Sequence, residues 1–255
     1  MRATRALVRR PGPRLAEGIV THIDRRPVDV ELAIKQWHGY VAAMQSAGWD
    51  PVEVPAADDC PDAVFVEDTV VIYRDLAVIT RPGADARRAE IAGTEGALAS
   101  LGYRIERIES PGTLDGGDVL KVADVMYVGC GGRTNGDGVR QLRRLVAPLD
   151  ARVVGVPVSK VLHLKSAVTA LPDGTVVGYP PLVDDVAMFP QFLAVPEESG
   201  AHVVLLGQDR LLVAVDCPRS IELFRRIGYE AVEVDVSEFQ KLEGCVTCLS
   251  VRLRG

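Results

Sequence analysis

A short unit that recurs along the chain constrains its fold more than any other feature. In this unit a helix-like segment ends in glycine and a short strand-like segment follows at once. Clear copies are Ala47-Gly48-Trp49 before 52–55, Leu101-Gly102-Tyr103 before 105–111 and Ile227-Gly228-Tyr229 before 232–235, and weaker copies lie at 153–157 and 192–196. The period of about 40–55 residues is typical of repeat architectures.

Each unit is followed by a second apolar strand, and polar residues stand near the start of most of these strands. The expected strands are 69–73 after Glu67-Asp68, 119–120 after Asp115-Gly116-Gly117-Asp118, 167–171 after His163-Leu164-Lys165-Ser166, 203–207 without obvious chemistry, and the strand that carries Cys248. Strand-and-helix repeats of this kind can close radially around a central channel. We therefore predict an α/β ring in which equivalent strand ends, and their acidic, histidine and cysteine side chains, meet at the axis.

The clearest helix is expected over 29–47. Five apolar residues recur there at alternating four- and three-residue steps and form one stripe, namely Val30, Ile34, Trp37, Val41 and Met44. Such a stripe is typical of an amphipathic helix that packs on a core. Gly48 is placed to end it, because glycine readily adopts the left-handed conformation that terminates helices.

Composition excludes several classes of function. The chain has 255 residues, 47% of them hydrophobic, with a formal net charge of −6 and a pI near 5.3. This acidic balance argues against nucleic acid or an anionic membrane as a partner, and no apolar run reaches membrane-spanning length. Five cysteines, an odd number scattered through the chain, do not form a disulfide framework, so we expect a reducing cytoplasm.

The segment 244–253 carries two thiols in a stretch apolar enough to be a buried strand. Its cysteines have three readings: small core side chains, half of a zinc or redox CxxC pair, or a nucleophile. A zinc site needs two more ligands, and no second CxxC or paired histidine motif exists. If the segment is one strand, Cys245 and Cys248 face opposite sides, so one can line a cavity while the other packs.

The other polar motifs also have structural readings. Asp115-Gly116-Gly117-Asp118 can be only a tight turn, and His163 alone is more often a core histidine. Their corresponding places in successive repeats favour a shared site instead. Arg133 in a glycine-rich loop is well placed to clamp a carboxylate, and the apolar end of the 11–20 loop either docks on the body or forms a lid.

Six motifs, in order across nearly the whole chain, match one family. They are 61–68 (PDAVFVED), 79–84 (ITRPGA), 114–120 (LDGGDVL), 133–135 (RTN), 162–166 (LHLKS) and 247–251 (TCLSV). With these motifs the chain resembles the dimethylarginine dimethylaminohydrolases of the guanidino-group-modifying superfamily. The resemblance implies a five-bladed pseudo-symmetric α/β propeller, the pentein fold, with residues 1–255 as a single catalytic domain.

The resemblance also implies roles for individual residues. Cys248 is the expected nucleophile, His163 the general acid and base, and Asp115 the carboxylate that orients His163. The expected substrate contacts are Glu67 and Asp68 near the guanidinium, Asp62 and the carbonyl near Leu242 at the α-ammonium, Arg87 and Arg133 at the α-carboxylate, and Val20 in the lid, where the family typically has leucine.

The implied activity is hydrolysis of asymmetric dimethylarginine and monomethylarginine to citrulline and an amine through a cysteine-bound S-alkylthiouronium, without metal or cofactor. The expected partner is this small molecule, with no nucleic acid and no membrane, and a homodimer stays open. Arginine and agmatine deiminases, which act on an unmethylated guanidinium, are the nearest alternative, but they generally carry His-x-Asp where this chain has His163-Leu164-Lys165. An amidinotransferase is a less favoured alternative, because that activity needs a site open to an acceptor amine. An alternative of another class is a non-catalytic zinc or redox module that uses Cys245 and Cys248.

The expected cluster of carboxylates has a consequence for stability. Several buried acids repel one another when no substrate cation is bound. From the sequence we therefore expect Glu67, Asp68 and Asp115 to destabilise the free protein, and Asp68→Asn to raise its thermal stability.

Overall fold

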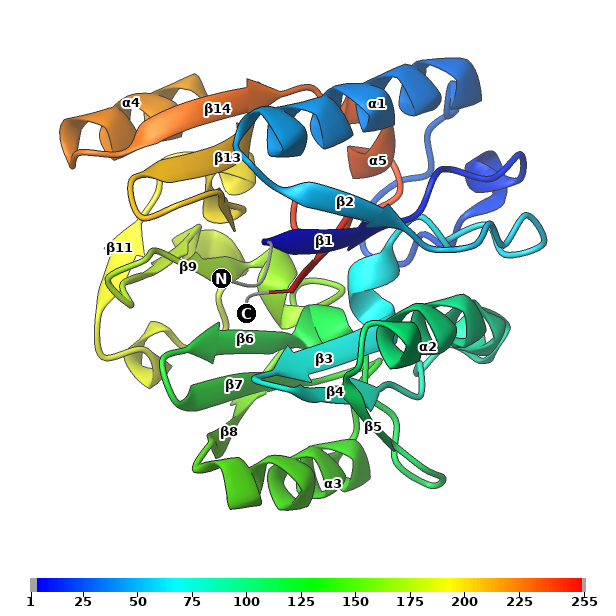
Figure 1. Ribbon diagram of the computed structural model, residues 1–255. Helices are drawn as coiled ribbons and strands as arrows, with labels where there is room; N and C mark the ends of the chain where they lie inside the picture. The colour runs from blue at the N-terminus through cyan, green and yellow to red at the C-terminus, as the bar shows by residue number, and fades with distance from the viewer. Residues whose placement is uncertain (1–3, 254–255) are drawn as a thin grey trace.

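The computed structural model, which describes residues 4–253, is a ring of five small sheets (Figure 1). Each sheet has three strands. Inner, middle and outer strands of the five sheets are β15–β1–β2 (Val251–Leu253, Arg5–Val8, Asp50–Glu53), β3–β4–β5 (Val70–Tyr73, Leu76–Ile79, Arg104–Arg107), β6–β7–β8 (Val119–Val122, Val125–Cys130, Arg152–Pro157), β9–β10–β11 (Val168–Ala170, Val176–Gly178, Phe192–Ala194) and β12–β13–β14 (Val204–Leu205, Arg210–Ala214, Glu230–Val234).

Strand directions repeat in every sheet. The inner strand pairs antiparallel with the middle strand, and the middle strand pairs parallel with the outer one. The first sheet joins both ends of the chain, because β15 pairs with β1 in the register Arg5 to Leu253. This pairing closes the ring. The predicted five-bladed α/β propeller is confirmed.

A parallel pair needs a crossover connection, which is usually a helix. Four of the five sheets use one: α1 (Val30–Ser46), α2 (Ile91–Ser100), α3 (Gly136–Val146) and α4 (Pro218–Arg226) join the middle to the outer strand. A further short helix, α5, spans Ser237–Gln240. In Figure 1 the four longer helices lie around the outside of the ring.

Glycines end three of these helices as predicted. Gly48, Gly102 and Gly228 have φ of 87°, 81° and 99°, a left-handed conformation that costs glycine no steric strain. The two weaker copies of the unit differ. After α3 the left-handed residue is Asp150 (φ 61°). The fourth sheet has two short 3₁₀ helices in place of an α-helix, η7 (Pro180–Leu182) and η8 (Val186–Met188), in a segment rich in proline.

Short 3₁₀ helices precede four of the inner strands. They are η2 (Val66–Thr69), η4 (Gly116–Asp118), η6 (Leu164–Ser166) and η9 (Glu198–Ala201). The remaining 3₁₀ helices are η1 (Leu15–Glu17), η3 (Asp85–Glu90) and η5 (Ala147–Leu149). Within residues 4–253, no helix is both long and apolar enough to cross a bilayer.

The predicted helix over 29–47 is confirmed as α1, and Asp29 caps it by accepting a hydrogen bond from the Leu32 N–H at 3.0 Å. Its buried face differs from the predicted stripe. Ile34 is 38% exposed, whereas Tyr40 is fully buried. The apolar pattern missed Tyr40 because its hydroxyl finds partners inside the protein, the Val246 carbonyl at 2.9 Å and the Ser250 hydroxyl at 2.8 Å.

Candidate functional site

Three neighbouring turns carry most of the side chains expected to do chemistry. Asp68 lies in η2, Asp115 directly precedes η4 and His163 directly precedes η6. The turns approach so closely that only glycine fits between them. A Cβ on Gly117 would lie 2.6 Å from Asp68 Oδ1 and 2.8 Å from His163 Nδ1, and one on Gly116 would lie 2.1 Å from the Glu67 carbonyl oxygen. The Gly-Gly pair therefore serves close packing at the axis.

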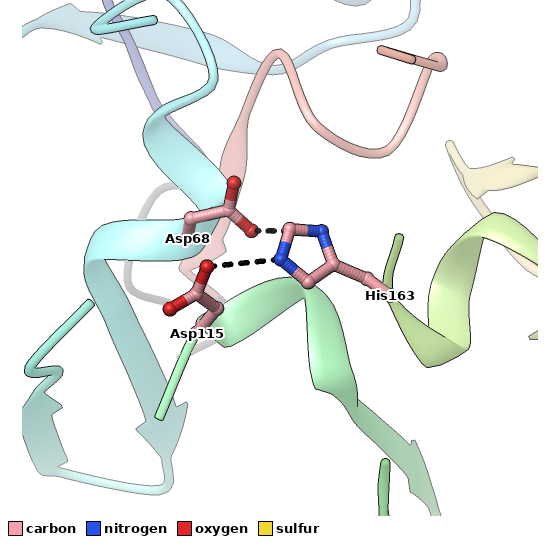
Figure 2. A group of neighbouring side chains, drawn as sticks. All are labelled: Asp68, Asp115 and His163. Atoms are coloured by element: carbon pink, nitrogen blue, oxygen red, sulfur yellow. Dashed lines mark hydrogen bonds and ion pairs between the residues drawn. The ribbon is translucent and has the colours of Figure 1, made fainter. Parts of the chain in front are cut away.

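Figure 2 shows the imidazole of His163 facing two carboxylates. Nε2 lies 2.9 Å from Asp115 Oδ2, a hydrogen bond that fixes the orientation of the ring. Nδ1 lies 3.7 Å from Asp68 Oδ1, which is too far for a hydrogen bond but close enough for charge attraction. All three side chains are buried.

These charges set the ionisation of His163. Burial alone would lower the pKa of His163, but the charge of Asp68 and the hydrogen bond with Asp115 outweigh burial and raise it to about 9. Burial would likewise raise the pKa of Asp68, but His163 and Arg87 lower it to about 2. The histidine is therefore a cation at neutral pH and can act as a proton donor.

A second network holds the His163 turn against the Asp115 turn. Asp118 accepts a hydrogen bond from the Leu164 N–H at 2.9 Å and another from the Thr134 hydroxyl at 2.6 Å, and the Thr134 oxygen accepts one from the Asp115 N–H at 3.1 Å. Burial raises the pKa of Asp118 to about 6. Asp118 thus supports the geometry of the histidine without reaching the pocket.

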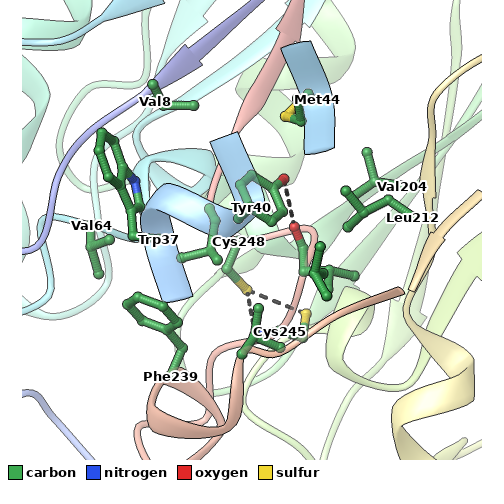
Figure 3. Packing of buried hydrophobic residues seen from close by; sticks show 14 of the residues in the cluster. Val8, Trp37, Tyr40, Met44, Val64, Val204, Leu212, Phe239, Cys245 and Cys248 are labelled. Atoms are coloured by element: carbon green, nitrogen blue, oxygen red, sulfur yellow. Dashed lines mark hydrogen bonds between the residues drawn. The ribbon is translucent and has the colours of Figure 1, made fainter. Parts of the chain in front are cut away.

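The cysteine segment is a turn rather than a strand. The Cys248 N–H donates to the Cys245 carbonyl at 3.1 Å, and β15 begins only at Val251. The alternation expected for a single strand therefore does not apply here, because a turn of this kind brings residues three apart together. Their sulfurs lie 3.4 Å apart (Figure 3).

Cys248 and His163 line the same small pocket. Asp62, Asp68, Arg87, Arg133 and Leu242 line it too, so most of the residues predicted for substrate contact are brought together. Asp115 is fully buried directly behind His163. The free volume of the pocket is about 10 Å³, roughly the room of one water molecule. A ligand of the size of arginine therefore enters only if part of the wall moves.

Two predicted site residues lie elsewhere. Ile19, one residue before Val20, is the loop residue on the pocket wall, while Val20 packs against the apolar cluster that contains Cys245 and Leu242. Glu67 lines the central channel instead, and its Oε1 accepts from Lys165 Nζ at 2.6 Å and from Arg252 Nη2 at 2.9 Å. Neighbouring residues of an extended loop or a tight turn point in different directions, and the contacts with Lys165 and Arg252 select the direction of Glu67.

The two arginines differ in how fully they are paired. Arg87 is buried and bonded to Asp68 at 2.6 Å and to Glu90 at 2.8 Å. Arg133 Nη1 lies 3.7 Å from Asp115 Oδ2 and has no hydrogen-bond partner among the described residues. Asp62 accepts hydrogen bonds from the Ile19 N–H at 3.1 Å, and burial raises its pKa despite Arg87. Arg133 is therefore the cation with a donor to spare for an anionic group.

A metal ion is the other occupant to test. Asp68, Asp115 and His163 offer ligand atoms within 4.8 Å of one another. However, Arg87 already neutralises Asp68, and Arg133 stands 3.7 Å from Asp115. Two guanidinium groups and a protonated imidazole beside these carboxylates leave little negative charge for a divalent cation.

Sequence reasoning missed the residue that fastens the loop over the pocket. Glu243 has a φ of 61°, and its carboxylate accepts from the Thr21 N–H at 2.9 Å and from the His22 N–H. Asp62 holds the same loop through Ile19. Glu243 belongs to no motif, so only its position beside the cysteine turn could have drawn attention to it.

No protein-family model matches the chain, but individual proteins do. It is 64% identical over 254 residues to the N(G),N(G)-dimethylarginine dimethylaminohydrolase of Streptomyces coelicolor, an alignment that covers all of this chain and 98% of that protein. The corresponding enzyme of Pseudomonas aeruginosa is 34% identical over 96% of this chain and 98% of its own length.

Solved structures agree. A variant of the Pseudomonas aeruginosa enzyme complexed with citrulline has a TM-score of 0.92 at 32% identity, covering 99% of this chain and 100% of that one. The N-terminal domain of an arginine dihydrolase from cyanobacteria, bound to its substrate, has a TM-score of 0.82 at 21% identity, covering 98% and 97% of the two chains, and shares the fold.

Proposed function

The chain belongs to the dimethylarginine dimethylaminohydrolase family, and from this premise we propose that it hydrolyses asymmetric dimethylarginine and monomethylarginine to citrulline and dimethylamine or methylamine. The observation that carries the proposal is the shared pocket of Cys248 and His163, with His163 held by Asp115 at 2.9 Å. Nucleophile and proton donor can thus reach the same guanidinium group, the sulfur at its carbon and the imidazole at the departing nitrogen. Citrulline in the complex of the Pseudomonas aeruginosa enzyme supports the product.

Binding is proposed to use the charges on the pocket wall. Asp68 faces the substrate guanidinium, and Asp62 with the carbonyl near Leu242 takes the α-ammonium group. Arg133 uses its spare donor on the α-carboxylate. Arg87, which lines the pocket but is bonded to Asp68 and Glu90, adds positive charge at that end. Ile19 and Val20 belong to the loop that must open and close over the substrate.

The chemistry proceeds in two stages. The Cys248 thiolate attacks the guanidinium carbon, and the cationic substrate stabilises this thiolate. Protonated His163 donates its proton to the departing amine, which leaves a positively charged S-alkylthiouronium on Cys248 and a neutral imidazole. That imidazole then takes one proton from the attacking water. Collapse of the resulting adduct releases citrulline and the thiolate, and the second proton of the water passes to solvent or to the released amine. His163 is suited to the first proton transfer because its raised pKa keeps it charged at neutral pH.

Preference for a methylated guanidinium is supported by Lys165. The sister deiminases generally have an acid at this place after the histidine. Here the corresponding residue is Lys165, which has no carboxylate. It is bonded to Glu67 at 2.6 Å, and the Glu67 carboxylate does not line the pocket either. Fewer acceptors remain for the NH groups of free arginine, and space is left for methyl groups.

The alternative zinc module lacks support, since the one metal-capable group found within residues 4–253 contains neither cysteine.

We extend the proposal to the organisation of the protein. Residues 1–255 act as one catalytic domain, since β15 and β1 close the ring only when both ends of the chain are present. All five cysteines are free thiols, which suits the cytoplasm. We propose a homodimer as the oligomeric state.

Amine release tests the proposal. Wild-type protein should release dimethylamine from asymmetric dimethylarginine faster than ammonia from arginine, and Cys248→Ser should abolish release. Cys217→Ser is the matched control, because Cys217 is an equally buried thiol bonded to the Ala214 carbonyl, away from the pocket. Faster turnover of arginine than of dimethylarginine would show that the protein is a deiminase. Full activity of Cys248→Ser would show that Cys248 is not the nucleophile.

A further inference from the structure

One buried thiol beside the proposed nucleophile has no role so far. Cys245 is 4% exposed and Cys248 is 7% exposed, and their sulfurs lie 3.4 Å apart, within hydrogen-bond distance (Figure 3). The backbone joins the two residues as well. The Cys245 N–H donates to Cys248 Sγ at 3.5 Å, and the Cys248 N–H donates to the Cys245 carbonyl at 3.1 Å. Cys245 thus meets the nucleophilic sulfur through both its N–H group and its thiol.

The two residues between these cysteines are anchored to other parts of the protein or to the pair itself. The Tyr40 hydroxyl of α1 donates to the Val246 carbonyl at 2.9 Å. The Thr247 hydroxyl lies 3.2 Å from Cys245 Sγ, so it can donate a hydrogen bond to that sulfur. The spacing of the two thiols is therefore fixed by the fold of the turn.

Charged groups of both signs surround each sulfur. The pocket that Cys248 lines also carries Asp62, Asp68, Arg87, Arg133, His163 and Glu243, and the Glu67 N–H donates to the Cys248 carbonyl at 3.2 Å. Cys245 lines a neighbouring cavity of about 720 Å³. The cations of that cavity are Arg26, Lys160 and Lys241, its acids are Glu197, Glu198, Asp216 and Glu243, and its histidines are His22 and His202. The protein's own charges therefore do not select one sulfur of the pair.

The substrate makes that selection. Its guanidinium group enters the pocket that Cys248 lines, whereas Cys245 faces the neighbouring cavity. A positive charge a few Å away favours the ionised form of a thiol, so the thiolate forms on Cys248. A thiolate sulfur can only accept hydrogen bonds. In the substrate complex Cys245 is therefore the donor of the sulfur–sulfur hydrogen bond.

We propose that Cys245 is a positioning residue for the nucleophile, which keeps its own proton and donates both its S–H and its N–H to the Cys248 thiolate. The inference rests on the proposed function, because the substrate cation draws the negative charge to Cys248. Cys248 gives its proton to solvent as the substrate binds, and its sulfur keeps an electron pair for the guanidinium carbon. The Thr247 hydroxyl donates to Cys245 Sγ in turn, and such a chain of donors strengthens each hydrogen bond.

Loss of the S–H donor should change the acidity and the reactivity of Cys248 in a linked way. A hydrogen bond to a charged group is stronger than one between neutral groups, but a thiol is a weak donor, so without it the thiolate should form about one pH unit higher. The thiolate that does form should attack about threefold faster, because nucleophilicity rises with about the 0.4–0.5 power of basicity. A purely structural defect would instead slow attack at every pH.

The test measures the first turnover at saturating asymmetric dimethylarginine. Dimethylamine leaves in the first stage of the reaction, so its rate of release between about pH 5 and pH 10 reports the ionisation of the substrate complex. In Cys245→Ala the acid limb of this profile should move up by about one pH unit. Release should then fall about threefold on the acid limb and rise about threefold on the plateau, because lost thiolate and greater reactivity combine. Cys245→Ser keeps a hydroxyl donor and should stay near the wild-type profile.

Further variants serve as controls. Cys217→Ala removes a buried thiol bonded to the Ala214 carbonyl, away from the pocket, and should leave the profile unchanged. Thr247→Val removes the hydroxyl beside Cys245 Sγ and should move the acid limb upward by less than Cys245→Ala does. This variant tests the same chain of donors if Cys245→Ala fails to fold. The basic limb, where His163 loses its proton, should stay in place in every variant.

The possible outcomes separate the inference from the proposed function. An acid limb that stays in place or moves downward in Cys245→Ala would overturn the inference, whatever happens to the overall rate. A Cys245→Ser profile shifted as far as that of Cys245→Ala would also overturn it, because hydrogen-bond donation would not be the cause. In each case amine release by the wild type still upholds the function. A wild type that releases no dimethylamine would overturn the function and the inference with it.

Discussion

Glu67 and Asp68 are neighbours in one 3₁₀ turn, both are buried carboxylates, and yet they serve different parts of the molecule. Asp68 faces the pocket, 3.7 Å from His163 and 2.6 Å from Arg87. Glu67 faces the central channel, a cavity of about 510 Å³ walled by the inner strands, and binds Lys165 and Arg252. The same turn thus supplies one acid to the pocket and another to the ion pairs that line the central channel.

This comparison teaches that the three acids expected to repel one another each have at least one cationic partner. Asp68 has Arg87, Asp115 has His163 and Glu67 has two partners. The expectation of unbalanced repulsion, and of a more stable Asp68→Asn protein, does not survive this pairing. Removing one partner of a buried pair leaves the other uncompensated, which destabilises a protein.

The largest expected effect is on the pocket side. His163→Asn removes the proton donor and should lower kcat by about 10²–10⁴-fold, the usual contribution of a general acid or base. Steady-state amine release measures this. His38→Asn, on the exposed face of α1, is the control and should keep full activity. A loss below about tenfold in His163→Asn would assign proton transfer to another group.

The neighbouring acids give the sharpest contrast. Glu67→Gln leaves Lys165 and Arg252 without a counter-charge and should cost about 3–5 kcal/mol of unfolding free energy, with kcat reduced less than about tenfold. Asp68→Asn should cost about 2 kcal/mol, since Arg87 keeps Glu90, but should cut activity by about 10²-fold or more. Chemical denaturation and amine release compare them. Equal activity of the two variants would show that the pocket-facing Asp68 is no more important for catalysis than the channel-facing Glu67.

The pH dependence of stability follows from His163. Its pKa is raised from 6.5 to about 9, so its stabilisation is complete below pH 6.5 and is lost as pH rises through about 9. The wild type should therefore lose about 3 kcal/mol more than His163→Asn between these limits. Asp68, with its pKa lowered to about 2, loses its contribution only as pH falls through that value. If the free energy of unfolding changed equally with pH in both proteins across pH 6.5–9.5, His163 would not be the group whose pKa is raised.

The smallest effect concerns the loop over the pocket. Glu243→Gln weakens the bonds to the Thr21 and His22 N–H groups, so the closed loop should become less favourable and KM should rise about two- to tenfold. Glu17→Gln is a suitable control, because its exposed ion pair with Arg14 contributes little. An unchanged KM in Glu243→Gln would mean that these bonds do not govern substrate entry.

The sequence predicted those parts of the protein that depend on local pattern. The repeated glycines at 48, 102 and 228, the strands that follow them and the helix over 30–46 come from steric and apolar rules that act within a few residues. Convergence of Cys248 and His163 followed from the repeat and from the family resemblance.

Other features depend on contacts between distant segments. The direction of Glu67 is decided by Lys165 and Arg252, and the cysteine turn is held by Tyr40 of α1 through the Val246 carbonyl. The buried face of α1 includes Gln36 and Tyr40, whose polar tips bond to other elements. Periodicity of apolar residues cannot reveal such partners, so these details required the structure.

The central claim is that Cys248 bonds covalently to the guanidino carbon while His163 is needed to release it. S-methyl-L-thiocitrulline tests this directly, because its thiolate leaving group departs without the proton that His163 supplies. Incubated with His163→Asn protein, it should leave a stable adduct that tandem mass spectrometry locates on Cys248. An unmodified Cys248, or an adduct on Cys245, would contradict the account.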